Sequence, residues 1–336
     1  MFNKLYVEVK AILKKNYKFF LVLIILGFIC NIQLPLYIDA PGGLIDVSKR
    51  ISISDSYEVK GSLNLAYVSE FKATVPTLIW SYFDKNWDLL KVNDVVSSNE
   101  TIEQNEYRNH LLLEEANQNA IYVGFNLAGE YVNITNNKVY VVYTTLDSKT
   151  DLQIRDQIIK VNGIDIGSKK EINNIINKCN SGDIIKFTVL NNNQTIERTG
   201  TVQNFNGFNV VGIVVSEIKD IDTNRDINFN FKSSESGPSG GFMMSLAIYN
   251  YLTENDITHG LKIAGTGTID ADGNVGTIGG IEYKIKGAIK NKVDVFFVPA
   301  GENYEDAYKL VNENNLNINL VKVSNIKDAI DYLNNL

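Results

Sequence analysis

Two clusters of residues in the last third of the chain could together perform nucleophilic chemistry. The first is Glu-Ser-Gly-Pro-Ser-Gly-Gly-Phe-Met-Met-Ser at 235–245, which places the hydroxyl of Ser239 on a turn before an apolar segment of helical spacing. The second, Gly-Gly-Ile-Glu-Tyr-Lys at 279–284, begins another helical segment and ends in Lys284. A serine can be activated by a neutral lysine in place of a histidine. The clusters therefore predict Ser239 as a nucleophile and Lys284 as its general base.

The residues around Ser239 favour a tight turn that can bind an oxyanion. Gly237 and Gly240 permit a close backbone approach that a side chain would block. Pro238 stiffens the bend and has no N–H group. The helix predicted over 241–252 would present free N–H groups and a partial positive charge beside Ser239, which suits a developing oxyanion. Taken alone, however, such a run is more often a loop with a helix cap.

A lysine acts as a base only when it is largely neutral. Lowering its pKa from about 10.4 to about 7.5 corresponds to roughly 4 kcal/mol of destabilised charge. Burial against an apolar wall could supply this, and the predicted helix offers four apolar side chains: Ile281, Ile285, Ala288 and Ile289. Lys286 would lie on a different helical face and is expected to be solvated.

Two histidines offer the alternative of a serine–histidine pair. His259 lies in a polar turn after a helix, and His110 lies among polar residues of an upstream helix, so both are expected to be solvated. No group of His, Cys, Asp and Glu has metal-ligand spacing, and no metal or other cofactor is expected. The chain has no Gly-x-x-x-x-Gly-Lys-Ser/Thr run, so no attached ATPase is predicted.

The elements expected around these clusters are short strands and helices. Apolar runs predict strands over 210–215, 227–231, 263–269 and 295–299, and helical spacing predicts a helix over 283–291. Asp272, Gly273 and Asn274 are expected to turn the chain between the third strand and the second cluster.

Residues 207–336 resemble the proteolytic domain of Lon-type (S16) proteases. Four blocks carry the resemblance in the family's order: Gly-Pro-Ser-small-Gly, Thr-Gly before a turn, Ile-Gly-Gly-x-x-x-Lys, and an apolar strand that ends in proline. The resemblance implies Ser239 as the nucleophile, Lys284 as the general base, and Thr266 as a hydroxyl that holds the lysine. Three positions depart from the pattern, since Ser236 replaces an acidic residue, Gly240 an alanine and Thr277 a proline. These departures remove no catalytic group.

The composition is that of an ordinary globular protein. The chain has 336 residues, which is long enough for two or three domains. Its net charge is -7, and it has no basic stripe that would bind nucleic acid. Its two cysteines, Cys30 and Cys179, lie far apart, so the fold is expected to need no disulfide.

The N-terminus is predicted to anchor the chain in a membrane. Residues 19–38 carry almost no charge over about 20 residues, roughly the span of a bilayer. Lysines before this segment favour a cytoplasmic tail over 1–18 and an extracytoplasmic remainder. The alternative is a cleaved signal peptide, but no good small-x-small cleavage site follows the apolar run.

Residues 39–128 are expected to form an extracytoplasmic α+β region. It would hold a strand over 51–54 and helices around 75–90 and 100–127. Trp80, Phe83 and Trp87 recur at three- and four-residue spacing in the first helix, which favours helix packing; a surface for substrate or lipid is the alternative.

Residues 129–206 resemble a PDZ domain of the permuted kind found in bacterial proteases. Leu152 to Gly163 and the Ser181-Gly-Asp turn carry the resemblance, and Arg155 stands where the family usually has glycine. Strands are expected over 139–144, 156–163 and 184–190, with a helix over 171–179. PDZ domains bind an extended chain beside an exposed strand. The alternative is that this module only packs against the proteolytic domain and binds no peptide.

Together with the predicted anchor and the PDZ-like module, the chain resembles membrane-anchored PDZ–Lon proteases, the YlbL-like group, over most of its length. The expected fold is a multidomain α+β protein with an N-terminal transmembrane helix, a PDZ-like β-rich module and a C-terminal Lon-type α/β domain. The expected function is an ATP-independent serine endopeptidase that cuts unfolded or extended segments of extracytoplasmic or membrane proteins. The resemblance also implies a homo-oligomer, often a hexamer. The alternatives are a catalytically silent PDZ-type scaffold that binds membrane proteins and an esterase or amidase with the same dyad.

Overall fold

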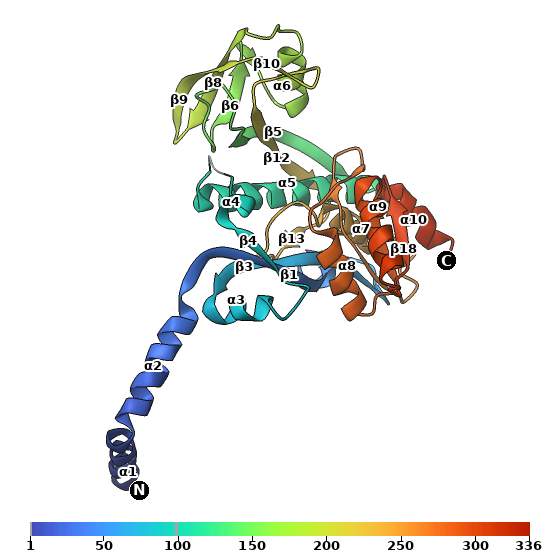
Figure 1. Ribbon diagram of the computed structural model, residues 1–336. Coiled ribbons are helices and arrows are strands. Elements are labelled where there is room, and N and C mark those ends of the chain that lie inside the picture. Colours follow the sequence, from blue (N-terminus) through green and yellow to red (C-terminus); the bar gives the residue numbers. More distant parts are fainter. Residues whose placement is uncertain (1, 98–99) are drawn as a thin grey trace. The chain divides into compact units, whose positions relative to one another are not determined.

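The computed structural model describes residues 2–97 and 100–336 and divides the chain into two units. Unit 1 comprises residues 1–41 and 69–95, and unit 2 comprises 42–68 and 96–336. Strands β1 (Gln33–Asp46) and β3 (Ser62–Thr74) run through both units. The remaining elements of unit 1 are α1 (Phe2–Lys15), α2 (Tyr17–Asn31), α3 (Val75–Ser81), β4 (Asp88–Lys91) and α4 (Val92–Val95) (Figure 1).

The predicted transmembrane helix over 19–38 is wrong. Helix α2 ends at Asn31, and the chain is extended from Gln33 onward as β1. Fifteen helical residues span roughly 22 Å, against about 30 Å of hydrocarbon in a bilayer. Among the described residues, no helix is both long and apolar enough to cross a membrane. Pro35 is compatible with this end, because a helix usually stops at or before the residue that precedes a proline.

The predicted helix over 75–90 is also too long. Helix α3 ends at Ser81, and residues 88–91 form β4, which pairs antiparallel with β1. The prediction that its aromatic side chains pack as one helix face is therefore wrong as well. Trp80 is 56 % exposed and Phe83 is 77 % exposed, while Trp87 lies edge-on to Phe71 with ring centroids 5.5 Å apart. Residues beyond the end of a helix no longer share its faces, so their spacing does not make an apolar stripe.

In unit 2, a largely parallel sheet carries the C-terminal region. The strand order is β18-β17-β14-β3-β1, and β14 pairs in parallel with both β3 and β17. Residues 62–65 of β3 pair with 262–265 of β14, so a segment near the start of the chain completes the sheet of the C-terminal region. The elements of this region are β14 (Lys262–Gly265), β15 (Thr268–Ile269), β16 (Val275–Gly276), β17 (Val295–Pro299), β18 (Leu320–Val323), α7 (Gly241–Leu252), α8 (Ile281–Lys290), α9 (Glu302–Glu313) and α10 (Ile326–Asn334).

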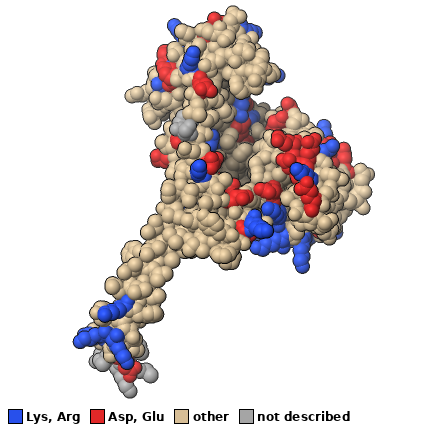
Figure 2. All heavy atoms as spheres, viewed as in Figure 1, with Lys and Arg blue, Asp and Glu red and all other residues tan. Residues whose placement is uncertain are grey.

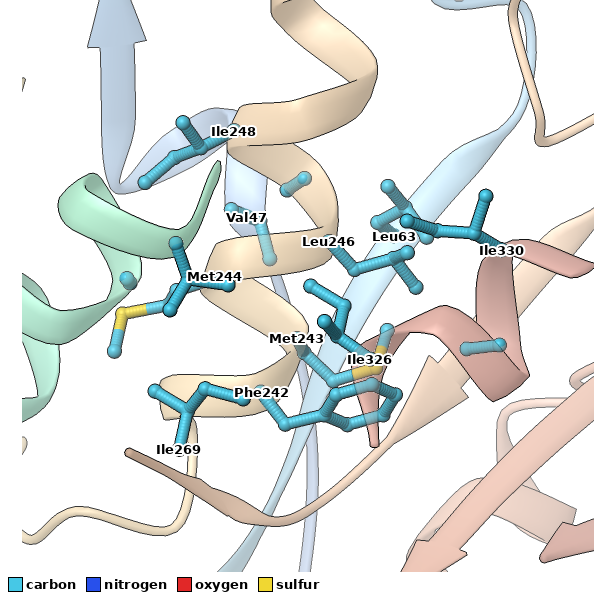
Figure 3. Close-up of a cluster of buried hydrophobic side chains, with 14 of the residues drawn as sticks. Val47, Leu63, Phe242, Met243, Met244, Leu246, Ile248, Ile269, Ile326 and Ile330 are labelled. Atoms are coloured by element: carbon cyan, nitrogen blue, oxygen red, sulfur yellow. The ribbon is translucent and has the colours of Figure 1, made fainter. Parts of the chain in front are cut away.

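Helices cover both faces of this sheet, because successive residues of its strands place apolar side chains on opposite faces. Leu63, Ile263 and Phe297 belong to a cluster with α5 (Ile102–Ala128), α7 and α10, whereas Ala264 and Phe296 belong to a cluster with α8 and α9. Helix α7 is apolar on nearly every side, and ten of its twelve residues are buried. Figure 3 shows its side chains, among them Met243, Met244, Leu246 and Ile248, inside the first cluster.

Residues 132–223 contain a second, antiparallel sheet and a two-stranded hairpin and are here named the β-rich module. Its sheet has the order β12-β5-β6-β8-β9, with β7 beside β6, and it encloses its own apolar core. The elements of the module are β5 (Val132–Thr144), β6 (Gln157–Val161), β7 (Ile164–Asp165), α6 (Lys169–Ile176), β8 (Ile184–Asn191), β9 (Gln194–Thr201), β10 (Gln203–Phe205), β11 (Phe208–Val210) and β12 (Ile213–Thr223). The strands and the helix predicted for this region are thus present, with shifted ends.

Arg155 of the β-rich module occupies a position that normally favours glycine. Its φ of 81° lies in the left-handed region, and its guanidinium lies 4.7 Å from the ring centroid of Tyr107 on α5. A guanidinium over an aromatic face is attracted by the ring. The departure from the PDZ pattern therefore adds a contact between the module and α5.

Helix α5 corresponds to the helix predicted around 100–127. It packs against α7 as well as against β5 and β12. Thr101 and Gln104 form a capping box at its start, and Gly129 in the left-handed conformation ends it. Gly124 allows the close crossing with α7, since a Cβ there would lie 2.5 Å from the Ile248 side chain. The remaining elements of unit 2 are η1 (Val47–Lys49), β2 (Ile51–Ile53) and β13 (Ile227–Phe229), of which β2 and β13 pair with each other.

Charged side chains of both signs are spread over the face shown in Figure 2, with acidic groups gathered over α9 and basic groups near α1 and the start of α2. Helix α9 carries Glu302 and Glu305 in its first turn, where the helix dipole favours negative charge.

Candidate active site

Ser239 lies at the end of a turn that is fixed to its neighbours on both sides. Gly237 has a φ of 88°, and its N–H donates to the carbonyl oxygen of Asn109 on α5 at 2.9 Å. The N–H of Gly241 donates to the oxygen of Pro238 at 3.1 Å, which closes the turn as α7 begins. Glycine fits the position of Gly237 because its conformation is strained for other residues.

Gly241 brings the start of α7 against two other segments. A Cβ at this position would lie 2.9 Å from Cγ2 of Ile269 and 3.5 Å from Cβ of Ala116. A side chain there would therefore push Ser239 away from β15 or from α5. The Gly-Gly pair after Ser239 is thus explained by close packing as well as by the turn.

Lys284 and Thr266 come from two further elements and meet at Ser239. The Nζ atom of Lys284 on α8 lies 3.0 Å from Ser239 Oγ and 3.0 Å from Thr266 Oγ1. Lys284 is 3 % exposed and Thr266 is fully buried. The structure therefore brings together the three residues that the sequence predicts as catalytic.

The hydrogen bonds of Thr266 determine which way the protons point. Its hydroxyl donates to the carbonyl oxygen of Ser239 at 3.1 Å. Its one proton is then engaged, so towards Lys284 this hydroxyl can only accept. A neutral Lys284 gives one hydrogen to Thr266 and keeps its lone pair for the proton of Ser239. That is the orientation a general base requires.

Burial favours the neutral form of Lys284. Desolvation in the apolar surroundings lowers the pKa of this ammonium from 10.5 to about 8. Helix α8 contributes Ile281, Ile285 and Ala288 to the buried cluster beneath the sheet, as expected from the sequence. At pH 7, about a tenth of the lysine is then neutral, roughly three hundred times more than for an unperturbed lysine.

The start of α7 offers hydrogen-bond donors beside Ser239 Oγ. In the part of the chain that the structure describes, the N–H groups of Ser239 and Gly240 donate to no acceptor. The carbonyl of Ser239 is held by Gly267 N–H at 2.8 Å as well as by Thr266. The turn is therefore rigid, with two donors free at a helix N-terminus, which suits an oxyanion.

The other basic candidates lie elsewhere. His259 Nε2 lies 3.0 Å from the carbonyl oxygen of Leu333, and His110 is exposed on α5. Lys286 lies 3.8 Å from Glu282 in an ion pair at the surface of α8 and 5.9 Å from the ring centroid of Tyr283. The structure brings none of the three to Ser239.

Two supports of the site are not predicted from the sequence. Arg50 binds Glu235 through two hydrogen bonds of 2.7 and 2.6 Å, and Glu235 lies four residues before Ser239. This pair raises the pKa of the Arg50 guanidinium and lowers that of the Glu235 carboxyl, each mainly through the hydrogen bond. Asn303 exchanges two hydrogen bonds with the backbone of Ile278 and so fixes the loop before α8. Partners this far apart in the chain leave no local pattern.

Part of the chain is similar to known proteins. Residues 231–334 match the family described as the Lon protease (S16) C-terminal proteolytic domain. Lon protease 2 of Borreliella burgdorferi is 30 % identical over 118 residues, or 34 % of this chain and 14 % of the relative. Lon protease of Aster yellows witches'-broom phytoplasma is 33 % identical over 99 residues, or 30 % of this chain and 12 % of the relative. The chain thus spans about an eighth of the length of these relatives.

Among solved structures, the chain is similar to two PDZ domains of SdrC-like proteins. The domain from Listeria monocytogenes is 20 % identical and covers 25 % of this chain and 92 % of that domain, with a TM-score of 0.22. The domain from Listeria innocua is 23 % identical and covers 23 % of this chain and 92 % of that domain, also with a TM-score of 0.22. The family match lies instead in the region that holds Ser239, Thr266 and Lys284, and this region is similar to the Lon-type (S16) proteolytic domain.

Proposed function

We propose that this protein is a serine endopeptidase in which Ser239 is the nucleophile and Lys284 the general base. The observation that carries the proposal is the position of Lys284 Nζ, 3.0 Å from both Ser239 Oγ and Thr266 Oγ1 in a buried site. The lowered pKa of Lys284 supports the same roles, because the base must accept a proton near neutral pH. Unfolded or extended protein segments are the proposed substrates, cut without ATP.

In the acylation step, Ser239 Oγ attacks the carbonyl carbon of a peptide bond and its proton passes to Lys284 Nζ. The N–H groups of Ser239 and Gly240 stabilise the oxyanion. The resulting Lys284 ammonium gives the proton to the leaving nitrogen, the C–N bond breaks, and an ester on Ser239 remains. Lys284 then takes a proton from water, which attacks the ester and releases the acid while Ser239 regains its proton.

Incubation of the full chain with unfolded casein tests the proposal. We expect peptides to accumulate in the absence of nucleotide, at a rate that added ATP leaves unchanged. A well-folded chain that releases no peptides would favour the PDZ-type scaffold. The homo-oligomer implied by the family resemblance stays a prediction, which light scattering of the full chain would measure.

The pH dependence of cleavage distinguishes the lysine from a histidine base. Because Lys284 must be neutral and its pKa is about 8, kcat/KM should rise about tenfold per pH unit below pH 8 and level off above it. The measurement is the initial rate of cleavage of a fluorogenic peptide from pH 6 to pH 10. A rise centred near pH 6.5 would instead point to a histidine.

Replacement of Thr266 tests its hydrogen bonds. Thr266→Val keeps the shape but removes the acceptor for Lys284 and the donor to Ser239. We expect kcat to fall by about ten- to a hundredfold, because the base loses its orientation. Thr266→Ser should retain most of the activity. Parent-like activity of Thr266→Val would contradict the role of the hydroxyl, and an equal loss in Thr266→Ser would show that the methyl group is needed as well.

A further inference from the structure

The segment from Thr266 to Ile269 holds Ser239 in place. Gly267 N–H donates to the carbonyl of Ser239 at 2.8 Å, and Gly267 in turn accepts from Phe242 N–H at 3.1 Å. Thr266 adds its hydroxyl hydrogen bond to the same Ser239 carbonyl. Any shift of this segment therefore moves the nucleophile and the partner of the base together.

One buried side chain outside the proteolytic domain binds the end of this segment. Asn119 on α5 is 6 % exposed, and its Nδ2 donates to the carbonyl oxygen of Ile269 at 3.0 Å. Ile269 also lies against the start of α7 at Gly241. Asn119 thus binds the segment at Ile269, whereas Ser239 is bound at Thr266 and Gly267. Among the residues that the structure describes, Asn119 forms no hydrogen bond with Ser239 or Lys284.

The orientation of the Asn119 amide is set by a buried ammonium. Lys219 on β12 is 6 % exposed, and its Nζ donates to Asn119 Oδ1 at 2.9 Å. Since an ammonium can only donate, Oδ1 must face Lys219, and Nδ2 must then face Ile269. Glu217 lies 3.7 Å from the same ammonium and balances its charge.

Lys219 belongs to the β-rich module, so this amide joins the module to the catalytic segment. Strand β12 pairs with β5 along its length, and Glu115 on α5 accepts a hydrogen bond from Ser216 at 2.7 Å and pairs with Lys169 of α6. Helix α5 is therefore bound to the module, while the Asn119 side chain binds Ile269 and the backbone carbonyl of Asn109 accepts from Gly237 N–H, two residues before Ser239.

We propose that Asn119 is a positioning residue for the reaction. Lys219 on strand β12 orients the Asn119 side chain, which holds the Thr266–Ile269 segment in place, and this segment in turn holds Ser239. This inference rests on the proposed peptidase function. A misplacement of about 1 Å in a catalytic group can lower a rate about a hundredfold, so one such hydrogen bond can matter although it lies away from the chemistry.

Asn119→Asp separates the two hydrogen bonds. The aspartate keeps an acceptor for Lys219, but it has no donor for Ile269 and places negative charge near that carbonyl. We expect kcat for the fluorogenic peptide to fall about tenfold or more, with KM nearly unchanged. Gln118→Met is the matched control. Gln118 lies beside Asn119 on α5 and accepts a hydrogen bond from the backbone N–H of Lys219 at 2.6 Å, but it forms no hydrogen bond with the described residues of the Thr266–Ile269 segment. It should leave kcat unchanged.

A second pair of variants keeps the inference testable if Asn119→Asp folds poorly. Lys219→Met removes the group that orients Asn119 and should lower kcat, whereas Lys219→Gln retains a donor and should preserve it. Hydrogen exchange gives a readout besides activity. The N–H groups of Gly267 and Phe242 should exchange at least about tenfold faster in Asn119→Asp and Lys219→Met, and at the parent rate in Gln118→Met.

Unchanged kcat and unchanged exchange in a folded Asn119→Asp variant would overturn the inference. Equal losses in Asn119→Asp and Gln118→Met would also overturn it, since they would indicate a general effect of the contact between α5 and β12. An inactive parent in which Asn119→Asp still accelerates exchange at Gly267 would refute the proposed peptidase but keep the positioning of Ser239 by Asn119.

Discussion

Replacing Ser239 with alanine is expected to lower the rate of peptide-bond cleavage by at least about a thousandfold while the protein stays folded. The variant lacks the proposed nucleophile, and the remaining hydroxyl at Lys284, that of Thr266, is fully buried and donates to the carbonyl of residue 239. Stability should change little, because within residues 2–97 and 100–336 the hydroxyl makes one side-chain hydrogen bond, to Lys284. The measurement is casein cleavage followed by mass spectrometry, with circular dichroism to check folding.

Ser236→Ala is the matched control for this experiment. Ser236 lies on the same turn and is exposed, so its replacement should leave the cleavage rate within about twofold. If Ser239→Ala kept a tenth or more of the parent rate, Ser239 would not be the nucleophile. A loss confined to Ser236→Ala would assign that role to the exposed serine.

Replacing Lys284 with methionine is expected to abolish cleavage and, at neutral pH, to make the protein more stable. Methionine has a similar length and no charge to desolvate. Lowering a lysine pKa from 10.5 to about 8 corresponds to about 3 kcal/mol of stability lost on burying the charged form. The gain should approach this value, less the hydrogen bonds that Lys284 makes with Ser239 and Thr266. The base would thus be an example of function that costs stability.

The pH dependence of this gain has a defined sign. Between pH 8 and pH 10.5 the unfolded chain holds the Lys284 proton and the folded protein does not, so the parent becomes more stable as the pH rises. The advantage of Lys284→Met should therefore be largest below pH 8 and vanish by about pH 10.5. Urea unfolding of both proteins at pH 7 and at pH 10.5 measures it.

Lys286→Met serves as the control, because Lys286 is partly exposed on the same helix and pairs with Glu282 at the surface. Its free energy of unfolding should change by less than about 1 kcal/mol at either pH. A Lys284→Met variant that is less stable than the parent at pH 7 would contradict the view that burial, rather than a charged partner, governs this lysine.

The errors in the sequence analysis share one cause. Composition and period predict helices over 19–38 and 75–90, but neither property indicates where a helix ends. In the structure α2 ends at Asn31 before Pro35, and α3 ends at Ser81. A proline and a short loop decide these ends locally, and their effect outweighs the pattern of the residues that follow.

The sequence by itself determined the local elements and the chemical groups. Helix α7 and strand β17 have the predicted bounds, 241–252 and 295–299, since the apolar patterns and glycine turns that define them are local. The candidate residues Ser239 and Lys284 also follow from short motifs, and Thr266 follows from the family resemblance that these motifs carry. Only the tertiary structure decided their 3.0 Å geometry, the burial that lowers the pKa of Lys284, and the supports supplied by Arg50 and Asn119. These depend on contacts between residues far apart in the chain, and a contact made by folding has no signature in the order of the residues around it.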